Sequence, residues 1–373
     1  MKKLDIIKLG RWWWTLDRWT LSALFTLILI GVILNFAGTP LIAKKLGYTP
    51  YHLLQKQLLF LFPSLLILVV TSMIPPIILR NICFSLLAIC ILLLVLTLFF
   101  GIEIKGARRW IRLFGFSFQA SEFIKPVFAV TSAWFFAHAK SSNDNLGRYV
   151  STFIFLMIAM LLLMQPDLGM TALLSLIWFV QFFLAGLPII FIVIIGFLGL
   201  TGLLGAYMLL PHVSSRIDRF FDPQSGDSYQ INKSLEAFAS GGLFGQGPGE
   251  GKIKAHLPDA HADFIFSVAG EEFGFIVCLG IVLLYTFILL RSFWLLYTKE
   301  NLFVLLAGAG ICVQFSTQAM INIASSLRLI PTKGMTLPFL SYGGSSLIAL
   351  SFSMGVLLAF TRTTRVEKTK KEN

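Results

Sequence analysis

The chain has 373 residues, of which 57% are hydrophobic and 13% are charged, and its formal net charge is +12 at pH 7. Soluble domains carry roughly a quarter charged residues, so this composition excludes an ordinary soluble protein and indicates a membrane protein with many spans. All four cysteines lie inside apolar runs without metal-ligand spacing, which is typical of small core residues.

The apolar runs predict an all-α integral membrane protein that forms a single domain over residues 1–373. A helix needs about 20 apolar residues to cross the hydrocarbon core, and prolines or glycines separate several of the runs. We therefore expect about ten transmembrane helices. They lie at residues 20–38, 57–75, 81–100, 122–139, 149–165, 168–185, 187–209, 265–290, 302–326 and 343–361.

Both ends of the chain are basic. Residues 1–19 also contain Trp12, Trp13 and Trp14, which are typical of the belt at a membrane–water interface. An even number of spans puts both ends on one side, and the basic tail at 362–373 favours the cytoplasmic side. When every loop is counted, Lys and Arg divide evenly between the two sides. The many outer cations therefore indicate an anionic ligand on the outer face.

The longest polar segment, residues 210–264, separates the seventh and eighth spans, and we expect it to be extracytoplasmic. A polar loop of this length is usually functional rather than a simple connection. Several glycines cluster between Gly241 and Gly251, but they match neither the dinucleotide-binding pattern nor the P-loop pattern. The cluster therefore predicts a flexible or tightly turned loop.

Charged residues surround the start of the fourth span. Glu122 and Lys125 are three residues apart and so share one face of a helix. One interpretation is a local ion pair in a helix that Ser121 caps. The other places Lys125 in a polar cavity inside the membrane, where charges are costly and usually functional. Arg108 and Arg109 would then extend a phosphate-binding patch, together with Arg112.

A second group of polar residues precedes the eighth span. His256, His261 and Asp263 match no strong zinc pattern. Asp263 could cap the helix, or it could serve as a general base at the membrane–water boundary. Glu271 and Glu272 follow inside the apolar run, where carboxylates need partners.

A third irregular segment, residues 329–346, separates the last two spans with two prolines and three glycines. Irregular backbone at membrane depth is tolerated where protein buries it or a watery cavity solvates it. Lys333 adds a further cation at this end of the spans. The segment is therefore either a structural re-entrant turn or part of a site.

These three regions resemble the signatures of one family, in the family's order. The segments are GARRWI with QASEFIK, LPDAHADFIF with GEEFG, and PTKGMTLPFLSYGGSS. They resemble the SEDS family (shape, elongation, division and sporulation proteins), and PTKG is most similar to the cell-division branch. Ala120 and Ala262 depart from the proline and threonine that are usual in the family.

The resemblance implies a peptidoglycan glycosyltransferase in the cytoplasmic membrane that polymerises lipid II, enriched at the division septum. It also implies a class B penicillin-binding protein and other division proteins as partners, and no nucleic acid. Asp263 would be the catalytic carboxylate, with Glu122 and Lys125 in the same cavity. The residues expected to contact the substrate are Arg108, Arg109, Trp110, His261, Lys333 and Ser341.

The expected mechanism uses one base and no carboxylate nucleophile, which favours an inverting displacement. Whether a divalent cation bridges the diphosphate is left open by the sequence. Three alternatives also stay open: a lipid II flippase, an elongation-type polymerase and a non-enzymatic scaffold. A flippase needs polar groups along a path through the bilayer, whereas these charges cluster on one side, which favours surface chemistry.

Overall fold

The computed structural model describes residues 9–45, 47–104, 107–113, 116–186, 229–331 and 333–363, with scattered positions between 190 and 218. The helical membrane fold is confirmed, and the described helices match nine of the expected spans. In the remaining span, 187–209, the structure describes only scattered positions, so this span is left untested. The helices are α1 Leu9–Thr15, α2 Arg18–Lys45, α3 His52–Met73, α4 Pro76–Phe100, α5 Ala120–Ser142, α6 Leu146–Met164, α7 Leu168–Leu184, α10 Tyr229–Gly241, α11 Ile265–Tyr297, α12 Leu302–Ser326 and α13 Gly344–Thr361.

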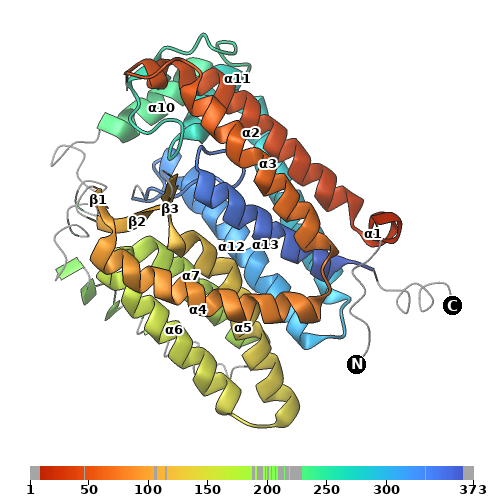
Figure 1. The fold of residues 1–373 in the computed structure, drawn as a ribbon. Helices are drawn as coiled ribbons and strands as arrows, with labels where there is room; N and C mark the ends of the chain where they lie inside the picture. Colours follow the sequence, from red (N-terminus) through yellow and green to blue (C-terminus); the bar gives the residue numbers. More distant parts are fainter. Residues whose placement is uncertain are drawn as a thin grey trace.

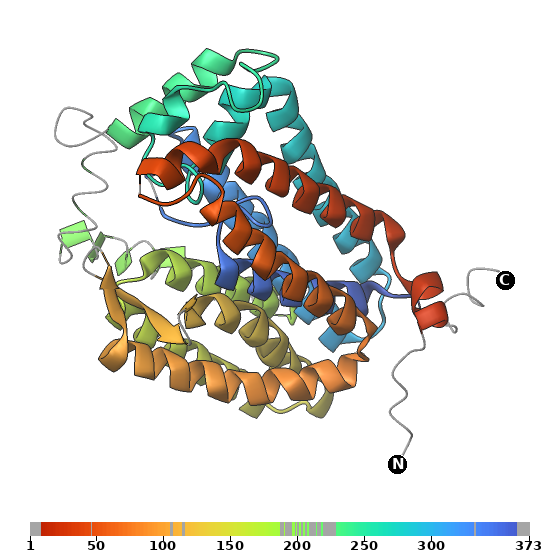
Figure 2. The same cartoon turned by 45° about the horizontal axis from the view of Figure 1, so that its top comes forward.

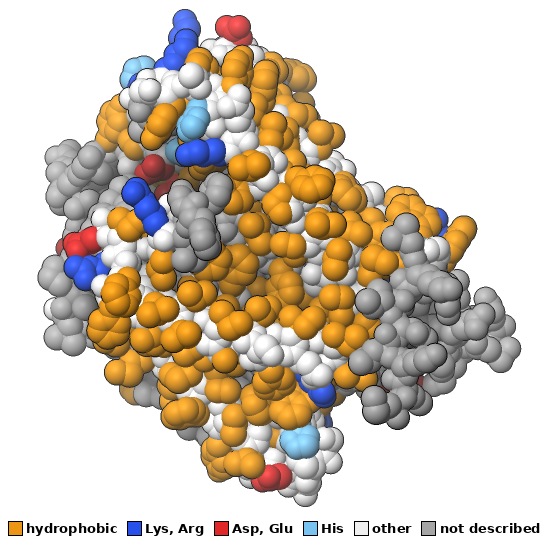
Figure 3. All heavy atoms as spheres, viewed as in Figure 1, with side chains coloured by type: hydrophobic (Ala, Val, Ile, Leu, Met, Phe, Trp, Pro, Cys, Tyr) orange, Lys and Arg blue, Asp and Glu red, His pale blue; other side chains and the backbone are white. Residues whose placement is uncertain are grey.

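The outer surface of this bundle is apolar along the helices. Seven of the described helices, α2, α3, α4, α6, α11, α12 and α13, are long and apolar enough to cross a membrane. Figure 3 shows hydrophobic side chains across the middle of one face, with most charged side chains toward its edges. This pattern is expected of a protein whose helices face lipid and whose loops face water.

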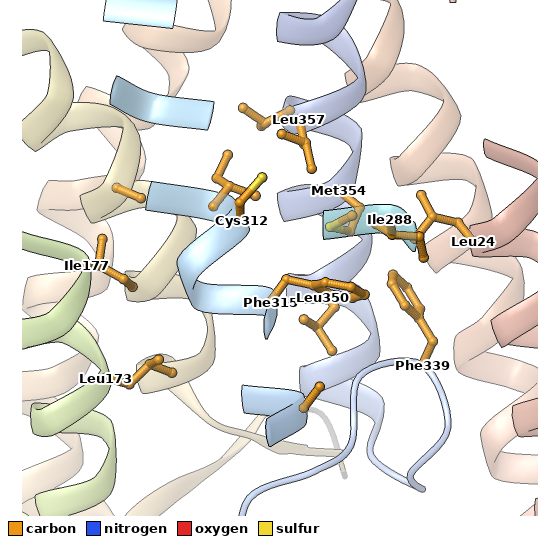
Figure 4. Close-up of a cluster of buried hydrophobic side chains, with 14 of the residues drawn as sticks. Leu24, Leu173, Ile177, Ile288, Cys312, Phe315, Phe339, Leu350, Met354 and Leu357 are labelled. Carbon is orange, nitrogen blue, oxygen red and sulfur yellow. The ribbon is translucent and has the colours of Figure 1, made fainter. Parts of the chain in front are cut away.

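Helix α5 is the central element. It packs against α4, α6, α7, α12 and α13, so most of its side chains are buried although it is less apolar than its neighbours. A second part of the core joins α7, α11, α12 and α13, where Phe315, Leu350 and Met354 lie close together (Figure 4). The central position of α5 explains how this span can carry Glu122 and Lys125, because neither side chain faces lipid.

A small sheet interrupts the helical bundle between α4 and α5. Its strands are β1 Ile102–Ile104, β2 Ala107–Leu113 and β3 Phe116–Phe118, and they pair antiparallel in the order β1-β2-β3. The sequence analysis did not predict it, because strands this short carry too little periodic pattern to be recognised. The sheet matters for the site because successive side chains of β2 point to opposite faces.

The two ends of the described chain lie together, as the even number of spans predicts (Figures 1 and 2). The backbone N–H of Thr363 donates to the Thr15 carbonyl over 3.0 Å. The buried Trp12 donates through Nε1 to the Ser72 hydroxyl at 2.9 Å, whereas Trp14 is exposed as the interfacial belt requires. Trp12 is thus an anchor of the bundle. The cytoplasmic placement of this end stays a prediction.

Arg362, expected at the start of the basic tail, is instead buried in the bundle. Its guanidinium donates to the carbonyl oxygens of Met73 and Ile74 at 3.2 and 3.1 Å. These carbonyls end α3 and have no partner within that helix. Arg362 therefore caps α3, and the segment that leaves the bundle begins after it.

The glycine-rich loop between α10 and α11 is tightly turned, which is one of the two forms expected from sequence. Helix α11 is broken at Gly274, whose φ of 76° lies in the left-handed region that favours glycine. The loop completes the hydrogen bonds of this break: Gln246 N–H donates to the Glu271 carbonyl at 2.9 Å, and Phe275 N–H donates to Gly242. The first turns of α11 are therefore joined to the loop that follows α10.

Candidate functional site

Five segments converge at the end of the bundle opposite to the chain termini. They are the starts of α5, α7 and α11, the end of α12, and the irregular segment that joins α12 to α13. Figure 2 shows the small sheet and α10 near this same end. The three charged regions singled out in the sequence are thus brought to one end of the fold.

The first part of the site is a buried ion pair. Lys125 Nζ lies 2.9 Å from Glu122 Oε2 and 2.9 Å from Gln318 Oε1, and the Lys125 side chain is only 1% exposed. The local pair expected from the spacing is confirmed. The expected cap is wrong, because α5 begins at Ala120, so Ser121 lies inside the helix. Gln318, from the middle of an apolar span, was not foreseen.

Gln318 links this pair to the irregular segment. Its Nε2 donates to the Thr336 carbonyl at 3.0 Å and to Thr336 Oγ1 at 3.1 Å. Thr336 Oγ1 in turn lies 2.8 Å from Ser346 Oγ at the start of α13. A chain of polar contacts therefore runs from Lys125 to the backbone of the segment. Buried polar groups are stable only when they are bonded in this way.

Asp263 lies on the other side of the same segment. Its carboxylate rests against the backbone of Gly334, where an added Cβ would come 2.9 Å from Oδ2. Asn322 Nδ2 donates to the Asp263 carbonyl at 2.9 Å and to the Met335 carbonyl at 2.7 Å. The structure places Phe264, not Asp263, at the cap position of α11. This contradicts the interpretation of Asp263 as a helix cap.

The third part of the site is a carboxylate that was not predicted from the sequence and that lies between the fifth and sixth expected spans. Asp167 is buried, and its two oxygens receive Lys333 Nζ at 2.8 Å and Arg109 Nε at 3.6 Å. Arg109 also donates to the carbonyl oxygens of Gln165 and Pro166. Asp167 caps α7 by accepting the Met170 N–H. A carboxylate at the end of a span is the sequence pattern that could have identified Asp167, as it identified Asp263.

Three of the four cations expected to form one phosphate-binding patch have different partners; they are Arg108, Arg109 and Lys125. Arg108 pairs with Glu103 at 3.3 Å on the exposed side of the sheet. Neighbours in a strand point to opposite faces, so Arg109 is directed toward Asp167 while Arg108 is not. Lys125 is held separately in its buried pair. Arg109 and Lys333 are therefore the cations that the structure brings together, and they remain partly exposed.

Ser341 and His261 connect the loop before α11 to the irregular segment. Ser341 Oγ donates to the Ala262 carbonyl at 2.5 Å and accepts the Leu337 N–H at 2.8 Å. The Tyr342 N–H donates to the His261 carbonyl at 2.9 Å, and the two rings lie 5.3 Å apart. Both residues therefore hold the two loops together. Their expected contacts with substrate stay predictions, as does that of Trp110, which pairs with Ile102 in the sheet.

The carboxylates inside α11 have the partners that the sequence analysis required. Both oxygens of Glu271 accept backbone N–H groups, from Ile253 at 2.7 Å and Lys254 at 2.8 Å. Glu272 forms a buried ion pair with Lys254, whose Nζ also donates to the Ala37 carbonyl at 3.1 Å. These contacts attach the loop between α10 and α11 to α11 and α2. The described residues contain no cluster of three or more His, Cys, Asp or Glu that could hold a metal ion.

We expect Gly334→Ala to lower activity without unfolding the protein. The new methyl group would meet the end of the Asp263 side chain, which can rotate away, so the fold is kept while the carboxylate moves. A misplacement of about 1 Å can cost on the order of 10² in rate. Comparing the activity that the motif resemblance implies, glycan polymerisation, with thermal stability in detergent tests this expectation. Full activity in a folded variant would show that the carboxylate needs no fixed position.

We also expect His261 to make stability depend on pH. Burial lowers the pKa of its imidazole below the usual value, although the charge of Asp259 opposes this shift. Its Nδ1 is buried without a hydrogen-bond partner among the described residues. The neutral form is therefore favoured in the folded state, and stability is lost as the pH falls below about 6.5. Melting temperatures between pH 7.5 and 5.5 should fall more for the parent than for His261→Asn, and parallel curves would contradict this.

Comparisons with known proteins agree with this architecture. The family model described as "Cell cycle protein", which covers FtsW, RodA and SpoVE, matches residues 18–366. A relative from Caulobacter vibrioides, named "Probable peptidoglycan glycosyltransferase FtsW", is 39% identical over 361 residues, 96% of this chain and 93% of its own length. Stage V sporulation protein E of Bacillus subtilis is 37% identical over 288 residues, 75% of this chain and 79% of its own.

Solved structures show the same fold. A chain of the structure titled "Structural coordination of polymerization and crosslinking by a peptidoglycan synthase complex" superimposes with a TM-score of 0.79, at 26% identity over 94% of this chain and 98% of that chain. The rod shape determining protein RodA of Thermus thermophilus gives a TM-score of 0.67, at 26% identity over 94% of this chain and 97% of that chain. The chain therefore belongs to the FtsW, RodA and SpoVE family of cell cycle proteins, the SEDS family that its motifs resemble.

Proposed function

We propose that this protein is a peptidoglycan glycosyltransferase that polymerises lipid II at the outer face of the cytoplasmic membrane. One observation carries the proposal: residues 333–336 link a general-base candidate to two cations, one of which, Lys333, belongs to the segment itself. Lys333 reaches Asp167, Gly334 lies against Asp263, and Thr336 leads through Gln318 to Lys125. A carboxylate beside fixed cations suits proton removal together with the departure of an anionic diphosphate.

In the proposed reaction Asp263 removes the proton from the 4-hydroxyl of the acceptor sugar. The hydroxyl oxygen attacks the anomeric carbon of the donor, the bond from that carbon to the diphosphate breaks, and undecaprenyl diphosphate leaves with the electron pair. Arg109 and Lys333 are exposed enough to meet that charge directly. Lys125 is fully buried. Its role is therefore to hold the polar network in place and to contribute a fixed positive electrostatic potential, rather than to touch the phosphate.

The names of the relatives favour the division branch within the family. We therefore propose a role in septal wall synthesis, with a class B penicillin-binding protein and other division proteins as partners. The structure with a TM-score of 0.79 belongs, by its title, to a peptidoglycan synthase complex, which supports a partner of this kind. An elongation-type polymerase is the alternative within the same chemistry.

The topology is a further part of the proposal. We place both termini in the cytoplasm and residues 210–264 outside, and we expect Ser225→Cys to react with an impermeant maleimide added to intact cells. Ser225 lies outside the described residues, so this expectation comes from the sequence alone. Labelling that appears only after the membrane is permeabilised would overturn the topology, and the outer-face mechanism with it.

The experiment that tests the function is a polymerisation assay with purified protein and lipid II, with and without a class B penicillin-binding protein. We expect glycan strands that depend on Asp263. A parallel assay in vesicles would measure transbilayer movement of labelled lipid II. Movement without polymerisation would favour the flippase, whereas neither activity would favour the scaffold.

A further inference from the structure

A second candidate binding site lies at the end of the bundle that holds the termini. Here the start of α4, the end of α5 and the start of α12 surround a surface pocket, whose lining includes Arg80, Trp134, His138 and Phe303. Figure 1 shows these three helix ends at the end of the molecule that also carries N and C. The pocket is separate from the candidate active site, which lies at the other end of α5.

The aromatic wall of the pocket positions a cation. The Arg80 guanidinium carbon lies 5.6 Å from the centre of the Trp134 ring, and the His138 ring stacks on the same tryptophan at 5.2 Å with an interplanar angle of 7°. Phe84 contacts the edge of Trp134 at 5.2 Å. Trp134 is therefore held in place, and it fixes the direction of both basic side chains.

Arg80 has hydrogen-bonding capacity left. Its Nε and Nη2 donate to Asn81 Oδ1 at 3.1 and 2.9 Å, and among the described residues no carboxylate lies within ion-pair distance. A guanidinium has five N–H donors, so several remain for an anion. The amino end of α12 adds favourable potential, although Asn301 already accepts the N–H groups of Phe303 and Val304.

The rest of the lining is mixed in a way that fits a lipid. Ile77 and Leu302 are apolar, whereas Ser141 brings a hydroxyl. Arg80 lies one turn inside α4, and a tryptophan beside an arginine at this depth is typical of the membrane–water interface. Basic pockets between transmembrane helices are suited to lipid headgroups, which bring a phosphate and acyl chains to one place.

We propose that this pocket binds an anionic phospholipid, with Arg80 pairing with the phosphodiester, His138 and Ser141 at the headgroup, and Ile77 and Leu302 against the first acyl carbons. The proposal does not depend on the polymerase activity. On this proposal, the end of the bundle that carries the termini recognises lipid, separately from the candidate active site.

Native mass spectrometry of the purified full-length protein with phosphatidylglycerol tests the proposal. We expect Arg80→Gln to weaken phosphatidylglycerol binding about tenfold, the scale of one charge-assisted contact, while binding of phosphatidylcholine stays unchanged. Arg148→Gln is the matched control, because Arg148 also bonds an asparagine side chain, Asn145, but does not line the pocket. Equal losses in both variants would show general surface charge, and no loss in Arg80→Gln would overturn the site.

Three further measurements make the result interpretable. His138→Ala removes a pocket ring and should also weaken phosphatidylglycerol binding, which covers the case in which Arg80→Gln does not fold. Melting temperature without added lipid reports folding for each variant. Inorganic phosphate and glycerol 3-phosphate serve as soluble competitors. If either displaces the lipid at equal concentration, the pocket recognises free phosphate and the lipid assignment is wrong.

Discussion

Asp263→Asn should reduce glycan polymerisation by at least about 10², the usual scale of general-base assistance, while the protein keeps its fold. An amide cannot take a proton, but asparagine has nearly the shape of aspartate. The turn around Asp263 is held through its backbone, by Asn322 on the carbonyl and by the Asp259 carbonyl on the N–H. The substitution therefore removes the basicity of the carboxylate and little else.

The measurement is the rate of glycan formation from lipid II by purified variant and parent, together with melting temperature and binding of the class B partner. Asn322→Ala is a useful comparison, because it releases the backbone of Asp263 without changing the carboxylate. Parental yields from Asp263→Asn would remove the proposed base. Another group would then have to accept the proton in the polymerisation step.

The second large effect concerns the buried pair of Glu122 and Lys125. Lys125→Met keeps the length of the side chain but leaves the Glu122 carboxylate buried without its charge partner. Breaking such a pair costs roughly 3–5 kcal/mol of stability. The double variant Glu122→Gln, Lys125→Met removes both charges and should recover most of that loss, since neutral groups of similar volume often replace buried pairs without penalty.

Activity separates the structural role of this pair from its functional role. If Lys125 contributes to the electrostatic environment of the leaving group, the stable double variant should still polymerise lipid II about 10²-fold more slowly. Polymerisation at the parental rate by the double variant would show that the pair only maintains the fold. Melting temperature and rate must be measured on the same preparations, because the single variant alone cannot distinguish the two roles.

The sequence predicted those features that depend on local spacing. Runs of apolar residues gave the spans, and the three-residue separation of Glu122 and Lys125 gave their contact. It also indicated that Glu271 and Glu272 need partners inside an apolar helix. These features are predictable because they depend on neighbouring residues in the chain and on the cost of burying a charge.

Contacts between distant segments could not be predicted in this way. Asp167 and Lys333 are 166 residues apart in the chain, and nothing in either local pattern indicates that they meet. The grouping of Arg108 with Arg109 failed because a three-residue strand pairs with β2 and turns the two side chains to different faces. Pairing between segments depends on the packing of the whole bundle, which one sequence does not reveal.

Helix α12 sets the spacing between two parts of the candidate active site. Gln318 and Asn322 are four residues apart, so their side chains leave the same face of α12 about one turn apart, which is ~6 Å along its axis. One holds the Lys125 network and the other holds the backbone of Asp263. The spacing of these two residues along α12 therefore sets how far the backbone of Asp263 lies from the Lys125 network. Changes in the length of the loop between α10 and α11 should leave that spacing unaltered.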